Sequence, residues 1–469
     1  MAATTANTAN PVKEEFRILS ATAILGYGFP TASFEAGMAR KPHLIAVDAG
    51  STDPGPYYLG AGVSFTNRGA VKRDLELMLN AGVPNKIPVV IGTAGGSGAD
   101  PHLAWCREII EEIARENNLH FKMAVIHAEL EKSFVAEAFR QGKIRPLEPA
   151  PALTEGEINA SAHIVAQMGL EPFLAALDEG VDVILAGRTY DPVCFAALPI
   201  KQGYDRALSL HLGKILECAS ICAAPGSGSD CMFGCIGEDY FRVEPLNPVR
   251  RCTTLSVAAH TLYEKTNPYI LPGPGGYLDL HDCRFEQETE AIVRVRGTRF
   301  MPGAAGGEMV NTVKLEGAKP VGFRTVSIAG CRDPIMISQI DAIITGVEER
   351  VADNFRGTLE NYHLRFNLYG RDGVMANLEP KAGTGGGHEL GIIIEAVAPS
   401  REQADTICSF ARSTMLHYGY PGRRSTAGNL AFPYSPSDFH AGEVYVFSVY
   451  HLLVVEDPAS LFRREIIQV

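Results

Sequence analysis

The sequence has little concentrated positive charge. Its net charge is −12 at pH 7, and no basic cluster is longer than a pair such as Arg423–Arg424. Because phosphate binding needs closely spaced Lys and Arg, these features argue against nucleic acid as a partner. A small acidic substrate stays compatible with them, since one local Arg outweighs a distant negative field.

Long apolar runs and abundant cysteine are also missing. No apolar run approaches the roughly 18 residues that a membrane helix needs, and the start, MAATTANTANPVKEEF, lacks the apolar core of a secretory signal. Ten cysteines in 469 residues are too few for a disulfide scaffold. We therefore expect a cytoplasmic protein with no membrane attachment, mostly reduced thiols and a loose tail over residues 1–14.

The N-terminal half alternates apolar, β-branched runs with segments of helical periodicity. Strands that are apolar on both faces predict a parallel sheet flanked by helices, and so an α/β fold, with a distorted barrel as the alternative. The predicted strands are 17–25, 43–50, 87–95, 121–129 and 181–189. We assign residues 15–315 to this α/β domain, which contains β insertions and the predicted active site.

The C-terminal third follows a different order. It predicts strands at 322–330, 362–370, 389–400 and 444–456, with helices at 334–355 and 401–419. This βαββαβ order is that of a ferredoxin-like α/β sandwich, which we place at residues 316–469.

Polar or small residues lie at or just beyond the ends of four of the predicted parallel strands. They are Asp48 and Ser51, Thr93 and Ser97, His127 and Glu129, and Arg188 and Asp191. The carboxyl ends of parallel strands meet at one edge of a sheet, where ligands bind in this fold class. We therefore predict a site at that edge.

The stretch VVIGTAGGSGADPH (89–102) joins a strand to a helix through a glycine-rich loop. Backbone N–H groups of Gly95, Gly96, Ser97 and Gly98 predict an oxyanion site at the helix N-terminus. The loop lacks both the Gly-Lys-Ser/Thr of a phosphate-binding loop and G-x-G-x-x-G spacing, so we expect no nucleotide cofactor. The alternative is a tight turn that needs glycine only for backbone geometry.

Gly187-Arg-Thr-Tyr-Asp-Pro192 directly follows the apolar run VDVILA. A guanidinium at this place can grip a substrate carboxylate through two parallel hydrogen bonds, and Asp191 can orient Arg188 or act as a base. The alternative is a local Arg188–Asp191 pair that closes the loop.

Three further side chains are candidates for proton transfer or metal binding. Asp48 lies where a strand opens into a turn, so a general base, a metal ligand and simple turn chemistry all fit it. His127 and Glu129 share one face of a strand end, and with Asp48 they form a candidate acid–base group or divalent metal site. A hydrogen-bonded core histidine is the alternative for His127. The metal stays open, with Asp48 and Glu129 as candidate ligands.

Three glycine- or cysteine-rich motifs carry weaker signals. Cys218-x3-Cys222 and Cys231-x3-Cys235 lack the C-x2-C spacing of zinc knuckles, and small residues one helical turn apart commonly pack together. Gly383-Thr-Gly-Gly-Gly-His-Glu389 fits either a flap or a linker.

Several segments resemble a known family. VDAGSTDPGPYYLG, LAGRTYDP, LHLGKILEC and LSVAAHTLYEKTNPYILPGPGGYLDL look like the acyclic terpene utilisation (AtuA-like) family, over most of the chain. LAGRTYDP and HTLYEKTNPY are the most specific parts. The C-terminal segments YHLRFNLYGRDGVMANLEP and RSTMLHYGYPGRRSTAGNLAFPYSPSD look like the branch that works with a small companion protein. The resemblance implies a cytoplasmic catabolic enzyme acting on a small organic acid or its CoA thioester.

We predict a hydratase, a dehydratase or a related lyase or isomerase that stabilises an enolate. Substrate binding is assigned to Arg188, Ser51, Gly95, Gly96, Ser97 and Gly98, and proton transfer to Asp48, His127 or Asp191. One alternative is an acyl-CoA or amide hydrolase or transferase with Ser97 as nucleophile. Another is a non-catalytic subunit of a two-component enzyme. We expect a homo-oligomer, with a small companion subunit as a candidate partner.

Overall fold

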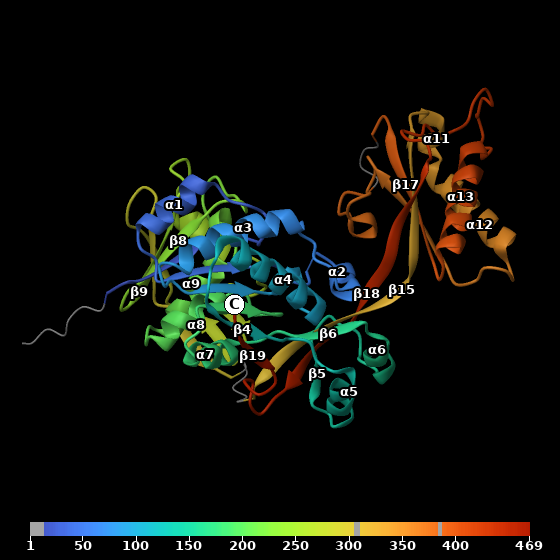
Figure 1. Cartoon of the computed structure of the whole chain (residues 1–469). Coiled ribbons are helices and arrows are strands. Elements are labelled where there is room, and N and C mark those ends of the chain that lie inside the picture. The colour runs from blue at the N-terminus through green and yellow to red at the C-terminus, as the bar shows by residue number, and fades with distance from the viewer. Residues whose placement is uncertain (1–13, 304–309, 383–386) are drawn as a thin grey trace, which may run out of the picture. The chain divides into compact units, whose positions relative to one another are not determined.

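The computed structural model describes residues 14–303, 310–382 and 387–469, which divide into two compact units (Figure 1). The first unit holds residues 1–319 and 447–469, and the second holds residues 320–446. The predicted second domain began at residue 316 and ran to the C-terminus, whereas the last segment returns to the first unit. Except for Glu14, the predicted tail lies outside the described residues, as do the glycines of 383–386.

The first unit is built on a mixed sheet with a parallel centre. β1 (Phe16–Ser20), β2 (Leu44–Asp48), β3 (Val89–Gly92), β7 (Val183–Ala186) and β4 (Lys122–Ile126) are parallel neighbours in that order. Antiparallel strands extend it: β8 (Met232–Ile236), β9 (Tyr240–Pro245), β13 (Val293–Arg296) and β12 (Arg284–Gln287) beyond β1, and β19 (Arg464–Gln468) beyond β4. The prediction of a parallel sheet flanked by helices is confirmed, with each predicted strand present.

Helices cover both faces of this sheet because its strands are apolar on both faces. Leu44 and Ala46 of β2 lie in one buried cluster, and Ile45 and Val47 lie in the other. α3 (Arg68–Gly82) and α4 (Asp100–Asn117) pack on the Ile45 face; α7 (Leu170–Asp178), α8 (Val193–Lys201) and α9 (Arg206–Leu216) pack on the Leu44 face (Figure 1). Within the described ranges, no helix combines the length and apolar character needed to span a bilayer.

Shorter elements complete the first unit around this frame. They are α1 (Thr31–Ala39), α2 (Pro56–Ala61), α5 (Lys132–Arg140), β5 (Ile144–Pro146), α6 (Glu155–Ala160), β6 (His163–Ala166), α10 (Thr254–Thr261), β10 (Ile270–Gly273), β11 (Gly276–Asp279) and β14 (Arg299–Pro302).

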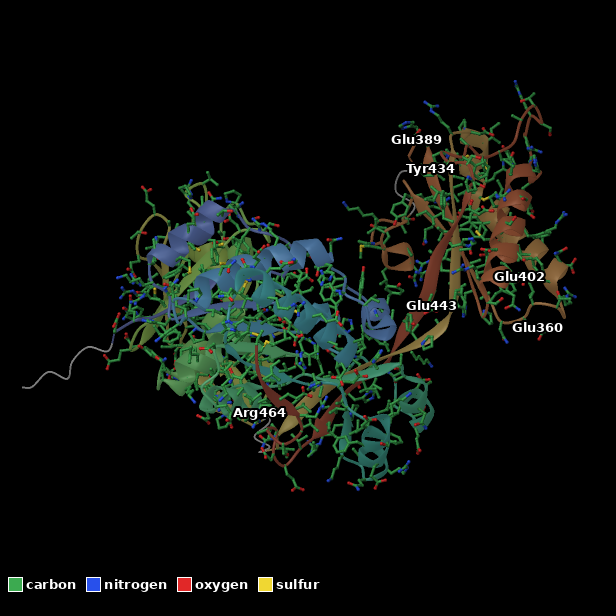
Figure 2. All side chains as sticks on the ribbon, viewed as in Figure 1. Glu360, Glu389, Glu402, Tyr434, Glu443 and Arg464 are labelled. Carbon is green, nitrogen blue, oxygen red and sulfur yellow. The ribbon has the colours of Figure 1, made fainter. Side chains whose placement is uncertain are left out.

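The second unit has the predicted order of elements. β15 (Thr312–Cys331) leads into it and β18 (Asp438–Val454) leads out. Between them lie α11 (Pro334–Ser338), α12 (Ile340–Phe355), β16 (His363–Tyr369), β17 (Leu390–Ala398) and α13 (Arg401–His417). The strands lie in the order β16-β17-β15-β18. Apolar residues of both long helices, such as Val347 and Ile407, pack with Ile392 and Ile394 of β17, while carboxylates such as Glu402 lie on the surface (Figure 2).

Candidate active site

Four parallel strands deliver their carboxyl ends to one edge of the sheet. Asp48 ends β2, Thr93 follows β3, His127 follows β4, and Arg188 comes shortly after β7. Because these strands are parallel neighbours, the predicted convergence of these chain segments is confirmed. Their side chains nevertheless separate into two groups, one at a cavity and one around the start of α4.

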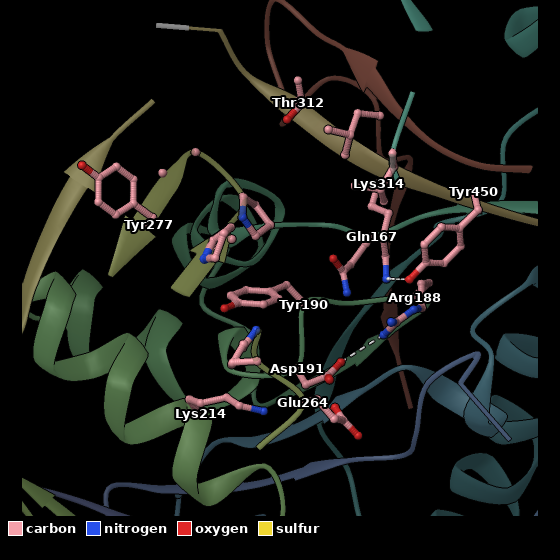
Figure 3. Close-up of a pocket in the computed structure, with 18 of the residues that line it drawn as sticks. Gln167, Arg188, Tyr190, Asp191, Lys214, Glu264, Tyr277, Thr312, Lys314 and Tyr450 are labelled. Carbon is pink, nitrogen blue, oxygen red and sulfur yellow. Dashed lines mark hydrogen bonds and ion pairs between the residues drawn. The ribbon is translucent and has the colours of Figure 1, made fainter. Parts of the chain in front are cut away.

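A cavity of about 800 Å³ lies within the first unit. This is the size of a small-molecule site. Cationic side chains in its wall are Arg145, Arg188, Lys214, Lys265 and Lys314, and acidic ones are Asp53, Asp191, Glu217 and Glu264. Figure 3 labels Arg188, Asp191, Lys214, Glu264 and Lys314 among them. Leu147, Val310 and Leu452 give another part of the wall apolar character.

Arg188 is only 2% exposed, and acidic and carbonyl groups hold its guanidinium. Nε and Nη2 donate to the carboxylate of Glu316 at 2.6 and 3.4 Å. Nη1 donates to Asp191 Oδ1 at 3.0 Å and to the Thr189 carbonyl at 2.7 Å (Figure 3). Burial opposes this positive charge, but Glu316 and Asp191 outweigh it and raise the pKa of Arg188. Arg188 thus orients Asp191, and its grip on a substrate carboxylate stays a prediction.

Glu316 is fully buried between two cations. Besides Arg188 it meets Lys314, whose Nζ lies 2.6 Å from Glu316 Oε1 and donates to the Tyr450 hydroxyl at 3.4 Å (Figure 3). Burial alone would raise the pKa of Glu316, but the two cations lower it to about 2. We call Arg188, Lys314 and Glu316 the Glu316 cluster; its carboxylate is ionised and fully paired.

The end of α9 brings a second charged pair to the cavity. Gly213 packs so closely on Pro192 that an added Cβ would lie 2.4 Å from the Pro192 carbonyl oxygen. This contact sets the last turn of α9 beside the loop that carries Asp191. Lys214 and Glu217, one turn apart, form an ion pair there and are both less than a tenth exposed.

Glu217 has an unusual protonation equilibrium. Burial raises its pKa to about 7; Asp191 adds to this effect and Lys214 opposes it. Burial also opposes the charge of Lys214, but Glu217 outweighs burial and raises the pKa of this lysine. Glu217 Oε2 has no hydrogen-bond partner in the described part of the chain. Glu217 can therefore both give and take a proton near neutral pH.

Lys265 faces the same cavity from the segment after α10. Its Nζ lies 5.8 Å from the centroid of the Tyr190 ring. Among the described residues, no carboxylate lies within ion-pair distance of it. Burial, and then the charge of Lys214, lowers the pKa of Lys265. We call Lys214, Glu217 and Lys265 the Glu217 cluster.

Asp48 is not part of the cavity wall and is 5% exposed. Its Oδ2 accepts from the Gly50 N–H at 3.1 Å, and Oδ1 has no partner among the described residues. Burial, and then Asp191, raises its pKa well above the ordinary value, while Arg188 opposes the shift. Ser51 stabilises the turn that follows, because its Oγ accepts a hydrogen bond from the Asp53 N–H at 3.2 Å.

The glycine loop is satisfied mainly by its own backbone. The amides of Gly96 and Gly98 donate to the carbonyls of Thr93 and Ala94 at 2.9 and 3.1 Å, and the Ser97 amide also donates to Ala94. Ser97 is 1% exposed and is not part of the cavity wall. The oxyanion role of Gly95, Gly96, Ser97 and Gly98, and the nucleophilic role of Ser97, stay predictions.

Gly98 has a clear structural role. Its φ is 71°, and an added Cβ would lie 2.1 Å from the Arg188 backbone nitrogen. Its carbonyl accepts the Arg188 N–H at 3.2 Å. Glycine is thus needed here for close approach of the two strand-end loops.

His127 and Glu129 belong to a network around the start of α4. His127 Nδ1 lies 2.7 Å from Asp100 Oδ1, and Glu129 Oε2 accepts the Asp100 N–H at 2.8 Å. Glu129 Oε1 lies 2.6 Å from His163 Nδ1. Neither His127 nor Glu129 is in the cavity wall. The described ranges contain no group of three His, Cys, Asp or Glu side chains placed to hold a metal ion. The candidate ligands Asp48 and Glu129 are therefore not part of such a group.

The cysteines of the two C-x3-C motifs are free thiols. Cys222, Cys231 and Cys235 are buried, and burial raises the pKa of Cys231 and Cys235. They pack as small apolar side chains in the described structure.

The sequence prediction missed Lys214, Glu217, Lys265 and Lys314 of the charged cavity wall, and Glu316, the buried partner of Lys314. Signals for them existed. Thr312, Lys314 and Glu316 alternate with apolar Val313 and Leu315, which marks one polar face of a strand. The other three lie in LHLGKILEC and HTLYEKTNPY, the segments that carry the family resemblance.

The comparison with known proteins identifies one family. The pattern described as "Acyclic terpene utilisation family protein AtuA" matches residues 68–227 and 247–438, which is most of the chain. No curated protein and no solved structure gives a match. The chain therefore belongs to the acyclic terpene utilisation family AtuA, whose description denotes a catabolic role.

Proposed function

We propose that this chain is a catabolic enzyme that moves a proton beside the carbonyl group of a small organic acid or its thioester. The reaction class is a hydratase, a dehydratase or a related lyase or isomerase. One observation carries the proposal: the Glu217 cluster and Asp191 meet at the cavity. Cations there stabilise the negative charge of an enolate, while a carboxyl group transfers the proton.

The two carboxyl groups have different tasks in this proposal. Arg188 Nη1 donates to Asp191 Oδ1 at 3.0 Å and so holds this carboxylate in place to take a proton from the substrate. Glu217, with a pKa of about 7, returns a proton or protonates a leaving hydroxyl near neutral pH. Lys214, whose pKa is raised, supplies the positive charge next to the developing enolate oxygen.

The cavity also supports a substrate class. The family description concerns acyclic terpenes, so the degraded compounds would be branched, largely apolar acids. Leu147, Val310 and Leu452 offer an apolar wall for such a chain, and Lys314 beside Arg188 offers a positive wall for its carboxylate. A thioester would place its acyl group in the same position.

The proposal is tested by α-proton exchange. The full chain is incubated in D₂O with branched unsaturated and hydroxy acids and their CoA thioesters, and NMR follows deuterium at the α-carbon. Asp191→Asn should abolish exchange. Asp178→Asn, which removes a surface partner of Lys201 away from the cavity, should leave exchange unchanged. Exchange that survives Asp191→Asn would contradict the assignment.

The expected assembly is a further part of the proposal. The C-terminal segments resemble the branch that works with a small companion protein, and we propose a homo-oligomer that pairs with such a subunit. Light scattering of the purified chain, alone and mixed with the product of a neighbouring gene, gives the stoichiometry. The same exchange assay on both samples shows whether the companion is needed.

A further inference from the structure

Three lysines in the cavity wall have different surroundings. Lys214 is paired with Glu217, and Lys314 is paired with Glu316 at 2.6 Å. Lys265 has no such ion pair among the described residues, and its Nζ lies 5.8 Å from the centroid of the Tyr190 ring. The carboxylates of Glu217, Asp191 and Glu264 interact with it electrostatically, but none of them forms an ion pair with it. An amine that faces a cavity without a carboxylate partner is placed to react with a ligand.

The backbone holds Lys265 at this wall in a constrained turn. Glu264, the residue before it, has a φ of 60°, in the left-handed region that non-glycine residues rarely adopt. The Lys265 N–H donates to the Leu262 carbonyl at 3.0 Å and closes the turn. Both Glu264 and Lys265 then line the cavity. Strained backbone of this kind concentrates at functional sites.

The electrostatic surroundings favour the neutral amine of Lys265. Burial, and then the neighbouring charge of Lys214, lowers its pKa from the ordinary value. The negative charges of Glu217, Asp191 and Glu264 oppose this shift but do not reverse it. A lysine that is desolvated beside another cation is a nucleophile toward carbonyl carbon. Since Lys214 is held by Glu217, its charge stays next to Lys265.

We propose that Nζ of Lys265 forms a Schiff base with the carbonyl group of an oxo acid. The amine attacks the carbonyl carbon, a C–N bond forms, and one proton passes from nitrogen to oxygen. The C–O bond then breaks, and the oxygen leaves as water with a proton from the Glu217 carboxyl. A protonated C=N bond remains, and no oxidation or reduction occurs.

This inference rests on the proposed function and narrows its substrate class. The positive C=N nitrogen draws electrons from the adjacent carbon, so Asp191 can remove a proton there to give an enamine. A hydroxyl group one carbon further away then leaves with a proton. The substrates are therefore oxo acids that carry a β-hydroxyl group, or the unsaturated oxo acids that form from them.

The test is reductive trapping on the full chain. The protein is incubated with 4-oxopentanoate and sodium borohydride, or with borohydride alone. We expect the intact mass to increase by that of the acid less one oxygen atom, and peptide mapping to place the adduct on Lys265. The labelling rate should rise with pH around a midpoint below 10.5, the ordinary pKa of lysine.

Two matched variants make the result specific. Lys265→Arg keeps the charge but has no reactive amine, so the adduct should be lost. Lys201→Arg, at the end of α8 outside the cavity wall, should label like the parent chain. Fluorescence of Trp105, the single tryptophan, verifies that each variant is folded.

The outcomes separate this inference from the proposed function. Absence of an adduct in a chain that still catalyses α-proton exchange overturns the Schiff base and leaves the proposed proton transfer standing. An equal adduct in Lys265→Arg overturns it as well. Adduct on Lys265 without exchange in any acid tested supports the Schiff base and contradicts the proposed lyase chemistry.

Discussion

The Glu316 cluster and the Glu217 cluster use the same residue types for different purposes. Glu316 lies between two cations, and its pKa falls to about 2. Glu217 forms an ion pair with one cation, Lys214, its Oε2 has no hydrogen-bond partner among the described residues, and its pKa rises to about 7. Both carboxyl groups are buried, so burial alone does not explain the difference.

The number of ion-pair partners distinguishes a buried carboxylate with a structural role from one that can transfer a proton. A buried carboxylate with complete ion pairs has one stable protonation state, so it can fix the position of Arg188 and through it Asp191. A buried carboxyl group with incomplete pairing has two protonation states of similar free energy. Perturbed groups of the second kind collect at functional sites.

Among changes to the two glutamates that distinguish the clusters, the largest effect is expected for Glu217→Gln. The variant keeps the shape of the side chain but cannot transfer a proton, so α-proton exchange should slow by about 10²- to 10⁴-fold. NMR of the exchange reaction measures the rate. Glu179→Gln, at the exposed end of α7, is the control. A near-normal rate of α-proton exchange in Glu217→Gln would show that Glu217, like Glu316, has only a structural role.

Glu316→Gln should affect stability instead. It leaves Arg188 and Lys314 buried with no full counter-charge, which typically costs about 3–5 kcal/mol. Urea unfolding followed by Trp105 fluorescence is the measurement, because this single tryptophan lies in α4 of the first unit. An unchanged midpoint would mean that the Glu316 ion pairs contribute no stability.

The two clusters should give opposite pH dependence of stability. The pKa of Glu217 is raised above 4.5, so its contribution is full below that pH and is lost as pH rises through about 7. The pKa of Glu316 is lowered, so its contribution is present above pH 4.5 and is lost as pH falls through about 2. Between pH 5 and 7.5 we expect a loss of roughly 1–3 kcal/mol that Glu217→Gln abolishes. Urea unfolding of the parent chain and of Glu217→Gln across this pH range measures the difference.

Gly98→Ala should disturb the position of the Glu316 cluster. The new Cβ would lie 2.1 Å from the Arg188 nitrogen at a φ of 71°, so a cost of about 1–3 kcal/mol is expected. Gly180→Ala is a matched control, since its φ is 66° but nothing lies within 4 Å of its Cβ position. Trp105 fluorescence should show the larger loss for Gly98→Ala; equal losses would show that φ alone matters.

The smallest effect is expected for Asp48→Asn. A raised pKa means that Asp48 carries a proton more readily than a free aspartate, so a neutral amide should change stability by less than about 1 kcal/mol. Urea midpoints at pH 5 and 8 test this. A large drop in α-proton exchange in the same variant would instead support Asp48 as a catalytic residue.

Much of the fold could be predicted because its signals are local. Apolar runs mark β1, β2, β3, β4 and β7, and parallel pairing then brings their ends to one edge. The spatial order could not be read from the chain, since β7 lies between β3 and β4 in the sheet. This insertion places Arg188 beside the Gly98 loop.

The candidate site was harder to predict because its main contacts join distant segments. Arg188 could be singled out from its place after a strand, but Glu316, its partner, is 128 residues further on. Lys214 and Glu217 follow helical spacing like any surface ion pair, yet both are buried, at a place where Gly213 contacts Pro192. Burial and pairing are tertiary properties, so residue type and spacing did not reveal them.

The return of residues 447–469 to the first unit has a consequence for biosynthesis. Tyr450 and Leu452 complete the cavity wall, and β19 closes the sheet beside β4. A nascent chain that is still emerging from the ribosome lacks this segment even when residues 14–319 have been synthesised. Full assembly of the cavity therefore waits for the last segment, and a prematurely terminated chain would be released with an incomplete site.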